Sequence, residues 1–269
     1  MAMVTLLSQF QGALLGTFGA KADSGGQNNV LEELYSQPRL NEGDVADSDL
    51  KEWWANLLQQ YFSTPSALSL GQAIPSALLT FDLEQVTETT LAGIHGTSIA
   101  TLTTADLTLF KEILHMSLSQ PSPVDWIKYR NLSADLNWTA LLEQVDQWFQ
   151  THPSDIPFNL FIDLTVYRLA IAGPDFHLAM SGLDGISPHQ ELLAMMMSSL
   201  FGARYGLAGF PSQYLIDVRP ELKLFGQCLF AQWAGAEKAA KVQTWAISPR
   251  GNLRQRRQQR QAYQKVEVL

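Results

Sequence analysis

Few residues in this chain have both a type and a spacing that could do chemistry. His189 and Glu191 stand two residues apart in the run Ser187-Pro188-His189-Gln190-Glu191. An imidazole beside a carboxylate could bind one metal ion, and imidazole suits Zn²⁺ or Ni²⁺ better than Mg²⁺. The same run is also typical of a helix start, with Ser187 as the cap and Glu191 as an acid near the positive end of the helix dipole. The helix start is the simpler interpretation.

Other catalytic arrangements lack their parts. Cys228 is the only cysteine, which excludes an internal disulfide and a thiolate metal cluster. Its apolar sequence neighbours indicate a small core residue, because no basic neighbour lowers its pKa. His95, His115 and His177 have no serine, aspartate or cysteine at a recognisable triad spacing. The chain also lacks the GxxxxGK[ST] motif of a phosphate-binding loop.

The composition predicts one domain with a large core. The chain has 269 residues, of which 46% are hydrophobic and only 16% charged, below the usual quarter for charged residues. The first 16 residues contain no basic residue ahead of their apolar run, so we do not expect a secretory signal. No uncharged apolar stretch reaches the roughly 18 residues needed to span a bilayer. We expect a cytoplasmic protein.

Charge is distributed unevenly along the chain. The net charge is −8, yet the segment from Arg250 to the C-terminus has six basic residues and one acid. An acidic body of net charge −13 therefore carries a basic tail of net charge +5. The tail could be solvated or fold back on the body, could bind a protein partner, or, less favoured, could bind nucleic acid or a membrane. Its candidate binding residues are Arg254, Arg256, Arg257 and Arg260.

Helical periodicity dominates the rest of the sequence and predicts an all-α fold. We expect a helical domain over residues 1-247 and a mobile, Gln/Arg-rich tail over residues 248-269. Small residues in the first helix, Gly12 and Gly16 among them, would let a neighbouring backbone approach closely. The expected helices are 6–18, 49–62, 66–79, 83–94, 104–118, 138–149, 158–172 and 188–205, with one or two more in 213–235 and a short one in 236–242.

Two segments at opposite ends of the chain resemble the signatures of the ADP-ribosylglycohydrolases. The first is Phe10-Gln-Gly-Ala-Leu-Leu-Gly16, and the second is Gly202-Ala-Arg-Tyr-Gly-Leu-Ala-Gly-Phe-Pro211. The first signature alone is only a helix rich in small residues, whereas the second is more specific. The resemblance implies an orthogonally packed multihelical bundle with the two signature helices adjacent at its centre. It also implies an ancestral site for two divalent cations, usually Mg²⁺ or Mn²⁺, between these helices.

In that family the cations are held by a Thr-Asp-Asp at the start of an early helix and by a Gly-Gly-Asp-Thr-Asp-Thr before the last signature helix. On this alignment His189 and Glu191 replace the two aspartates of the second motif, and Leu192 replaces its final threonine. Two hard cations ordinarily need more anionic oxygen donors than remain. The resemblance places the remnant cleft at Lys21, where the family has an aspartate, and at Asp47, Ser48 and Asp49, near the early Thr-Asp-Asp, together with His189 and Glu191.

Three functional hypotheses follow from these patterns. The first is a catalytically silent relative that binds a protein partner, or an ADP-ribose-like ligand in the remnant cleft, and needs no metal or other cofactor. The second is an active ADP-ribosyl hydrolase with a remodelled site around Asp49, His189 and Glu191, which would use Mg²⁺ or Mn²⁺. The third is a structural assembly factor that acts through the basic tail and through exposed aromatic residues, for which Trp53, Trp54 and Trp126 are candidates.

Overall fold

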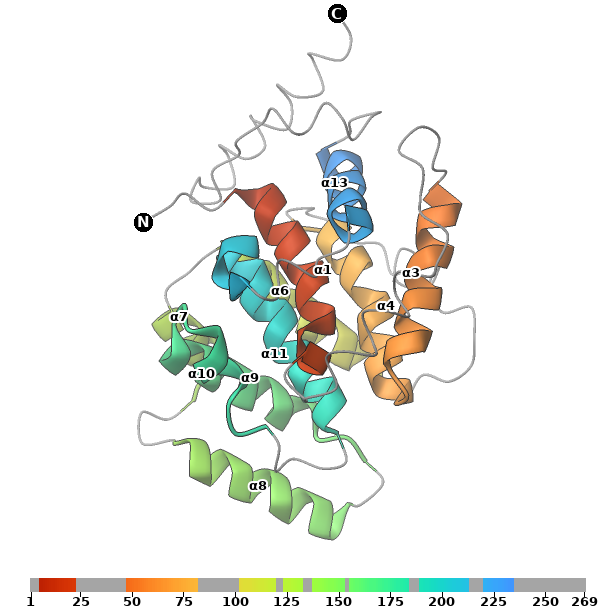
Figure 1. Cartoon of the computed structure of the whole chain (residues 1–269). Coiled ribbons are helices and arrows are strands. Elements are labelled where there is room, and N and C mark those ends of the chain that lie inside the picture. Colours follow the sequence, from red (N-terminus) through yellow and green to blue (C-terminus); the bar gives the residue numbers. More distant parts are fainter. Residues whose placement is uncertain are drawn as a thin grey trace, which may run out of the picture.

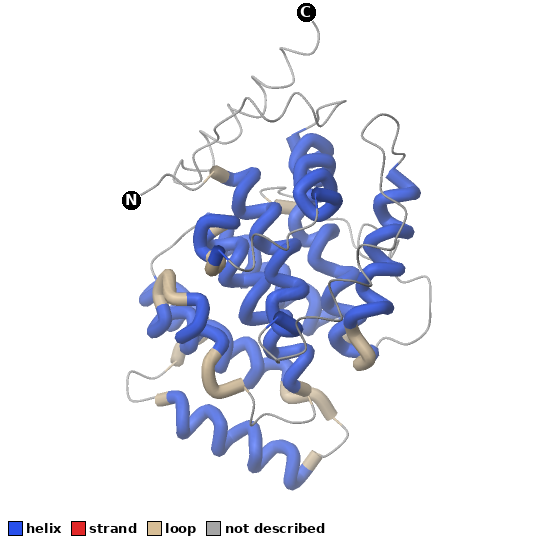
Figure 2. The backbone as a smooth tube through the Cα atoms, in the orientation of Figure 1, coloured by secondary structure: helices blue, strands red, loops and turns tan. Residues whose placement is uncertain are grey.

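The described part of the chain is all-α. The structure is a computed structural model, and it describes residues 5–22, 47–81, 102–119, 123–132, 137–152, 155–183, 189–212 and 220–234. Helices and short connections make up all of these segments, with no strand among them (Figure 2). Within the same segments no helix combines the length and the apolar character needed to cross a membrane.

The helices are labelled in Figure 1. In chain order they are α1 (Leu6–Ala22), α3 (Asp47–Tyr61), α4 (Pro65–Leu79), α6 (Thr104–Ser119), α7 (Pro123–Tyr129), α8 (Trp138–Thr151), α9 (Phe158–Ala172), α10 (Phe176–Met180), α11 (Gln190–Tyr205), the short 3-10 helix η1 (Leu207–Gly209) and α13 (Pro220–Ala234).

Several helix ends form where local chemistry predicts them. The Asn137 side chain caps α8 by accepting a hydrogen bond from the Ala140 amide at 2.9 Å. At the start of α6, Thr103 and Asp106 cap each other: the Thr103 amide donates to the Asp106 carboxylate at 2.9 Å, and the Asp106 amide donates to the Thr103 hydroxyl at 3.2 Å. The segment 158–172, which periodicity alone could have made a helix or a strand, is the helix α9.

Other helix boundaries differ from the sequence prediction. Pro123 was expected to end a helix, but it is the first residue of α7, because proline fits the first helical position, where no amide donor is needed. The five-residue α10 was not predicted. Helix α11 begins at Gln190 with His189 as its N-cap, two residues later than predicted. Ser187, the predicted cap, lies outside the described residues, as does the helix expected at 83–94.

Helices α1 and α11 lie against each other at the centre of the molecule (Figure 1). Every residue from Gln9 to Thr17 in α1 is buried, and so is every residue from Leu192 to Ala203 in α11. A helix that is apolar on all sides belongs in the core of a larger protein. The two segments that carry the family resemblance are therefore neighbours, as predicted from the sequence.

Glycine makes this close approach possible. A Cβ atom added to Gly202 would lie 1.9 Å from the Gly12 carbonyl oxygen, and one added to Gly16 would lie 2.1 Å from the Ser198 carbonyl oxygen. The Ser198 hydroxyl also donates a hydrogen bond to the Gly16 carbonyl, so that the two backbones are joined by a polar contact within the core. The predicted role of Gly12 and Gly16 is confirmed.

Aromatic side chains fill much of the remaining core. Trp53 is 8% exposed, Trp54 3% and Trp126 0%, so the expectation that these residues are exposed is wrong. Trp53 and Trp54 pack on Phe225 of α13, with ring centroids 5.9 and 5.1 Å apart. Their burial gains hydrophobic free energy that an exposed position would forgo. The three tryptophans are therefore part of the core.

Candidate functional site

Only two of the six residues predicted for the remnant cleft have side chains that the structure describes. Lys21 lies in the last turn of α1, and Asp47, Ser48 and Asp49 form the first turn of α3, but their side chains lie outside the described part. His189 and Glu191 are described, at the start of α11. The tail residues Arg254, Arg256, Arg257 and Arg260 also lie outside the described residues.

The Glu191 carboxylate reaches across to the start of α4. It accepts hydrogen bonds from the amide and the hydroxyl of Thr64 at 3.3 and 3.1 Å. It also accepts from the amide and the hydroxyl of Ser63, both at 3.4 Å. One carboxylate oxygen, Oε2, takes part in all four contacts, while Oε1 lies 3.4 Å from the Ser63 hydroxyl. Four donors from two adjacent residues therefore surround one anionic group.

These contacts supply a cap that α4 does not make for itself. Thr64 is the N-cap residue of α4, and its side chain makes no capping hydrogen bond to the helix. The first amides of a helix have no partner within it, and the dipole places partial positive charge at that end. Glu191 satisfies this end from another helix, 127 residues further along the chain. Its own position in the first turn of α11 also suits an acid.

The His189 side chain contacts a different pair of helices. Its imidazole lies almost parallel to the Phe149 ring of α8, with centroids 5.3 Å apart and an interplanar angle of 21°. It also lies 6.0 Å from the Phe161 ring of α9. Burial among these rings lowers the pKa of His189 below its ordinary value, because the charged form loses hydration. His189 is therefore favoured in its neutral form.

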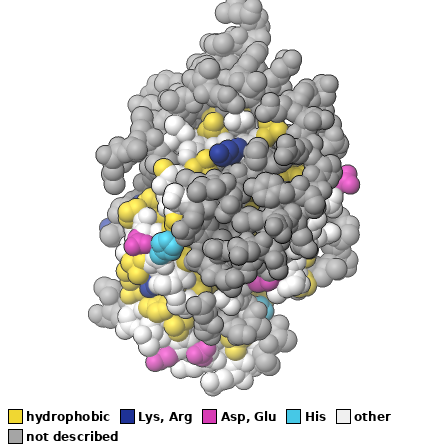
Figure 3. Space-filling view, in the orientation of Figure 1, with side chains coloured by type: hydrophobic (Ala, Val, Ile, Leu, Met, Phe, Trp, Pro, Cys, Tyr) yellow, Lys and Arg dark blue, Asp and Glu magenta, His cyan; other side chains and the backbone are white. Residues whose placement is uncertain are grey.

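His189 and Glu191 consequently do not converge on a common point. One side chain contacts α8 and α9, and the other contacts the start of α4. Within the described segments no group of three or more His, Cys, Asp or Glu side chains is placed to hold a metal ion. On the face shown in Figure 3, the described acidic side chains lie at separate places. The pairing of His189 with Glu191 as ligands of one soft ion is not formed in this arrangement.

Ser63 and Thr64 are the site residues that the sequence interpretation missed. The early Thr-Asp-Asp was placed near Ala46 to Leu50, at the start of α3, whereas the helix start that meets Glu191 is that of α4. A signal was present: a Ser-Thr-Pro run directly before an apolar helical segment marks a helix start. That signal locates the start of α4 but does not indicate that the partner is Glu191.

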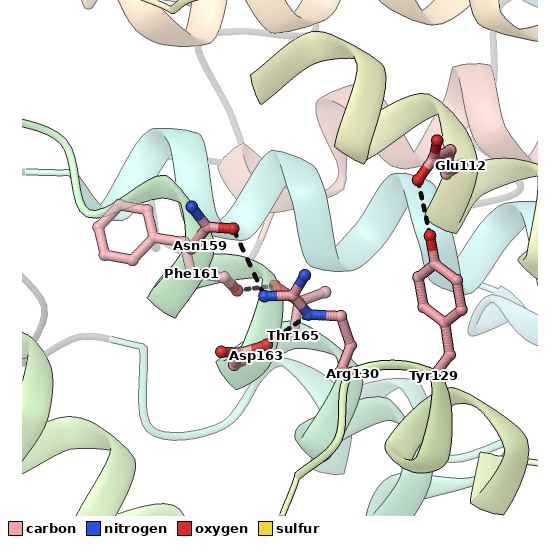
Figure 4. A network of polar contacts seen from close by, with 7 residues as sticks. All are labelled: Glu112, Tyr129, Arg130, Asn159, Phe161, Asp163 and Thr165. Atoms are coloured by element: carbon pink, nitrogen blue, oxygen red, sulfur yellow. Dashed lines mark hydrogen bonds and ion pairs between the residues drawn. The ribbon is translucent and has the colours of Figure 1, made fainter. Parts of the chain in front are cut away.

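A second polar cluster joins α6, α7 and α9 (Figure 4). Arg130, directly after α7, forms an ion pair with Asp163 of α9, with 2.6 Å between Nε and the carboxylate oxygen. Their side chains are only 17% and 16% exposed, so the two charges compensate each other with little help from water. Nearby, the Tyr129 hydroxyl donates to Glu112 at 2.6 Å, and this bond raises the pKa of Tyr129. The cluster is satisfied internally and holds helices together.

We compared the chain with known protein families, with curated proteins and with solved structures. None of the three comparisons finds a match. The resemblance to the ADP-ribosylglycohydrolases therefore stays a prediction that depends on the two sequence segments.

Proposed function

We propose that this chain is a catalytically silent ADP-ribosylglycohydrolase-like protein that acts as a binding or regulatory module. The observation that carries the proposal is the position of the Glu191 carboxylate. This residue stands where the resemblance places a metal-binding aspartate, and its carboxylate is bound by Ser63 and Thr64 at the start of α4.

The coordination chemistry of hard cations gives this observation its weight. Mg²⁺ and Mn²⁺ are held by several oxygen ligands in a close array. A carboxylate offers about four lone-pair positions, and Glu191 already accepts from four donors. To coordinate a cation it would have to release these donors and leave the start of α4 without its cap. The arrangement therefore favours a structural role for Glu191.

The environment of His189 supports the same interpretation. The resemblance assigns His189 to the other aspartate position, and its imidazole stacks on Phe149 instead. A neutral ring held between aromatic side chains supplies no anionic oxygen. Both replaced positions have thus acquired contacts of a kind that maintains the helix arrangement.

The core of the proposed fold does not depend on a metal. Helices α1 and α11 meet through backbone and small residues, without any charged side chain between Gly12, Gly16, Ser198 and Gly202. Such a core can persist while the site beside it changes. We infer an orthogonally packed multihelical bundle of the ADP-ribosylglycohydrolase type that has kept its centre and lost its chemistry.

The ligand that we propose is an ADP-ribose-like nucleotide in the remnant cleft, or a protein partner that contacts the same face. Metal-independent binding would be the mark of a silent relative, because the ancestral cations orient the ribose for cleavage. No described observation favours the assembly-factor hypothesis, since the tryptophans that it needs at the surface are buried.

Calorimetric titration of the full chain with ADP-ribose, with and without Mg²⁺ or Mn²⁺, tests this proposal. Parallel incubation with ADP-ribosylated protein, followed by detection of released ADP-ribose, measures turnover. We expect any binding of ADP-ribose to be unchanged by the metals, and no release of product. Binding that requires metal, together with metal-dependent release of ADP-ribose, would show that the chain is an active hydrolase.

A further inference from the structure

Two arginines lie beside α9, and they differ in how their charge is compensated. Arg130 forms the ion pair with Asp163 described above and also lies 3.5 Å from the Asn159 side-chain oxygen. Arg168, near the other end of α9, makes hydrogen bonds only to neutral groups. Its Nη2 donates to the Ser181 carbonyl at 2.9 Å and to the Ser181 hydroxyl. Among the described residues no carboxylate pairs with Arg168.

The Arg168 guanidinium also lies against an indole ring. Its central carbon is 4.9 Å from the centroid of Trp138, the first residue of α8, within the range of a cation–π contact. The stacked ring and neighbouring groups cover Nε, which is buried without a hydrogen-bond partner. This desolvation lowers the pKa of Arg168 from its ordinary value. A partly desolvated cation without an anionic partner is costly unless a ligand supplies the charge.

Neighbouring backbone leaves this corner open. Ser181 and Gly182 follow α10 and are exposed. Gly182 has a positive φ of 83°, and a Cβ atom added there would come no closer than 3.4 Å to any neighbour, the nearest being Nε1 of Trp138. Asp175, the acid at the other end of α10, accepts a hydrogen bond from the Leu178 amide as that helix's cap. The acid nearest in sequence to this corner therefore has another role.

We propose that Arg168, with Trp138 and the Ser181–Gly182 turn, forms a binding site for an oxyanion, either a phosphate or a carboxylate carried by a ligand. The planar guanidinium donates in a fixed geometry that matches both groups. Nη2 is occupied by Ser181 and Nε is covered, which leaves Nη1 as the donor that the oxyanion reaches. The site involves α8, α9 and α10, and it is independent of the cleft between α4 and α11.

Titration of the full chain followed by NMR of the indole N–H groups tests this site. Phosphate, acetate and chloride are added in separate titrations at constant ionic strength. We expect phosphate or acetate to shift the Trp138 indole resonance saturably, and chloride to leave it unchanged. The oxyanion that binds more tightly identifies the ligand group as a phosphate or a carboxylate. A Trp138 resonance that responds equally to chloride, or to none of the three anions, would overturn the proposal.

Two arginine variants provide the matched comparison. In Arg168→Gln we expect the affinity for the oxyanion to fall at least about tenfold, the effect of losing a charge-assisted hydrogen bond. In Arg130→Gln, which removes an arginine already paired with Asp163, we expect the Trp138 response to be retained. Retention of the response in Arg168→Gln, or its loss only in Arg130→Gln, would contradict the assignment. The measurement on the unmodified chain remains decisive if either variant does not fold.

Discussion

The two ends of α11 hold their neighbours by different means. Its C-terminal half lies directly on α1, with backbone against backbone at Gly202 and Gly12. Its N-terminal end uses side chains, with Glu191 bonded to the start of α4 and His189 stacked on α8. The first contact cannot accommodate one added carbon, whereas the second is made of parts that can be exchanged. A fold built this way can keep its centre while its site changes.

The largest effect is expected at the centre. Gly202→Ala places a carbon 1.9 Å from the Gly12 carbonyl oxygen, and a backbone atom cannot move aside as a flexible side chain can. Overpacking of a core ordinarily costs about 1–3 kcal/mol and sometimes more. We expect a loss of at least about 3 kcal/mol in the free energy of unfolding, measured by urea denaturation.

Gly173→Ala is the control for this substitution. Gly173 has a φ of 56°, and nothing lies within 4 Å of an added Cβ. The control tests the cost of an alanine in the left-handed region without a steric clash, which is about 1–2 kcal/mol. If Gly202→Ala is no more destabilising than Gly173→Ala, the close crossing of α1 and α11 is wrong.

A pH-dependent effect is expected at the far end of α4, the helix that Glu191 caps at its start. His115 donates through Nε2 to the Ala77 carbonyl at 2.7 Å, and burial lowers its pKa to about 4. Between pH 6.5 and 4 the unfolded chain binds a proton that the folded chain excludes. Stability contributed by the neutral ring is therefore complete above pH 6.5 and falls as the pH falls, by about 3 kcal/mol at most.

Denaturation of the unmodified chain and of His115→Gln at several pH values measures this dependence. The variant keeps a neutral side-chain donor but cannot titrate, so we expect its unfolding free energy to fall less steeply below pH 6.5. Equal slopes for the two proteins would show that His115 is not buried as described.

A smaller effect is expected at the start of α11. Glu191→Ala removes the cap of α4, and loss of a helix cap typically costs about 1 kcal/mol. Glu191→Gln keeps an oxygen acceptor and should lose less. Glu143, an exposed acid on α8, provides the control, because Glu143→Ala should change stability by no more than about 0.5 kcal/mol. Thermal unfolding of the three variants checks the order, and a neutral Glu191→Ala would refute the cap.

The smallest effect at neutral pH is expected for His189→Phe. The replacement keeps an aromatic ring between Phe149 and Phe161, so we expect stability at pH 7 to change by no more than about 0.5 kcal/mol. Because the folded pKa of His189 is lowered, its neutral form stabilises the fold less as the pH falls below 6.5. The variant should therefore be more stable than the unmodified chain in acid. Chemical denaturation at pH 7 and pH 5 distinguishes the two proteins.

The sequence predicted the centre of the fold well. Gly12 and Gly16 stand four residues apart in an apolar helix, and this pattern indicates close contact with another backbone whatever the partner is. The helical periods of 138–149 and 158–172 likewise identify α8 and α9, because amphipathic faces and caps are local properties. Short helices such as α10 carry too few residues for a periodic signal.

The site could be predicted only in part. Glu191 was identified as an acid at a helix start, but its partners Ser63 and Thr64 lie 128 and 127 residues away. A contact at that separation depends on the tertiary arrangement and leaves no local pattern. The placement of His189 between two phenylalanines has the same origin. Trp53, Trp54 and Trp126 were misjudged as exposed because an indole suits a core and a binding surface equally well.

The central claim is that the Glu191 carboxylate caps α4 and does not ligate a cation. Diffraction from crystals soaked in Mn²⁺, recorded for its anomalous signal, tests this claim most directly. We predict that Glu191 remains bonded to Ser63 and Thr64 without a manganese peak beside it. Two strong anomalous peaks between Glu191 and the start of α3 or α4, with the carboxylate turned away from Thr64, would contradict the account.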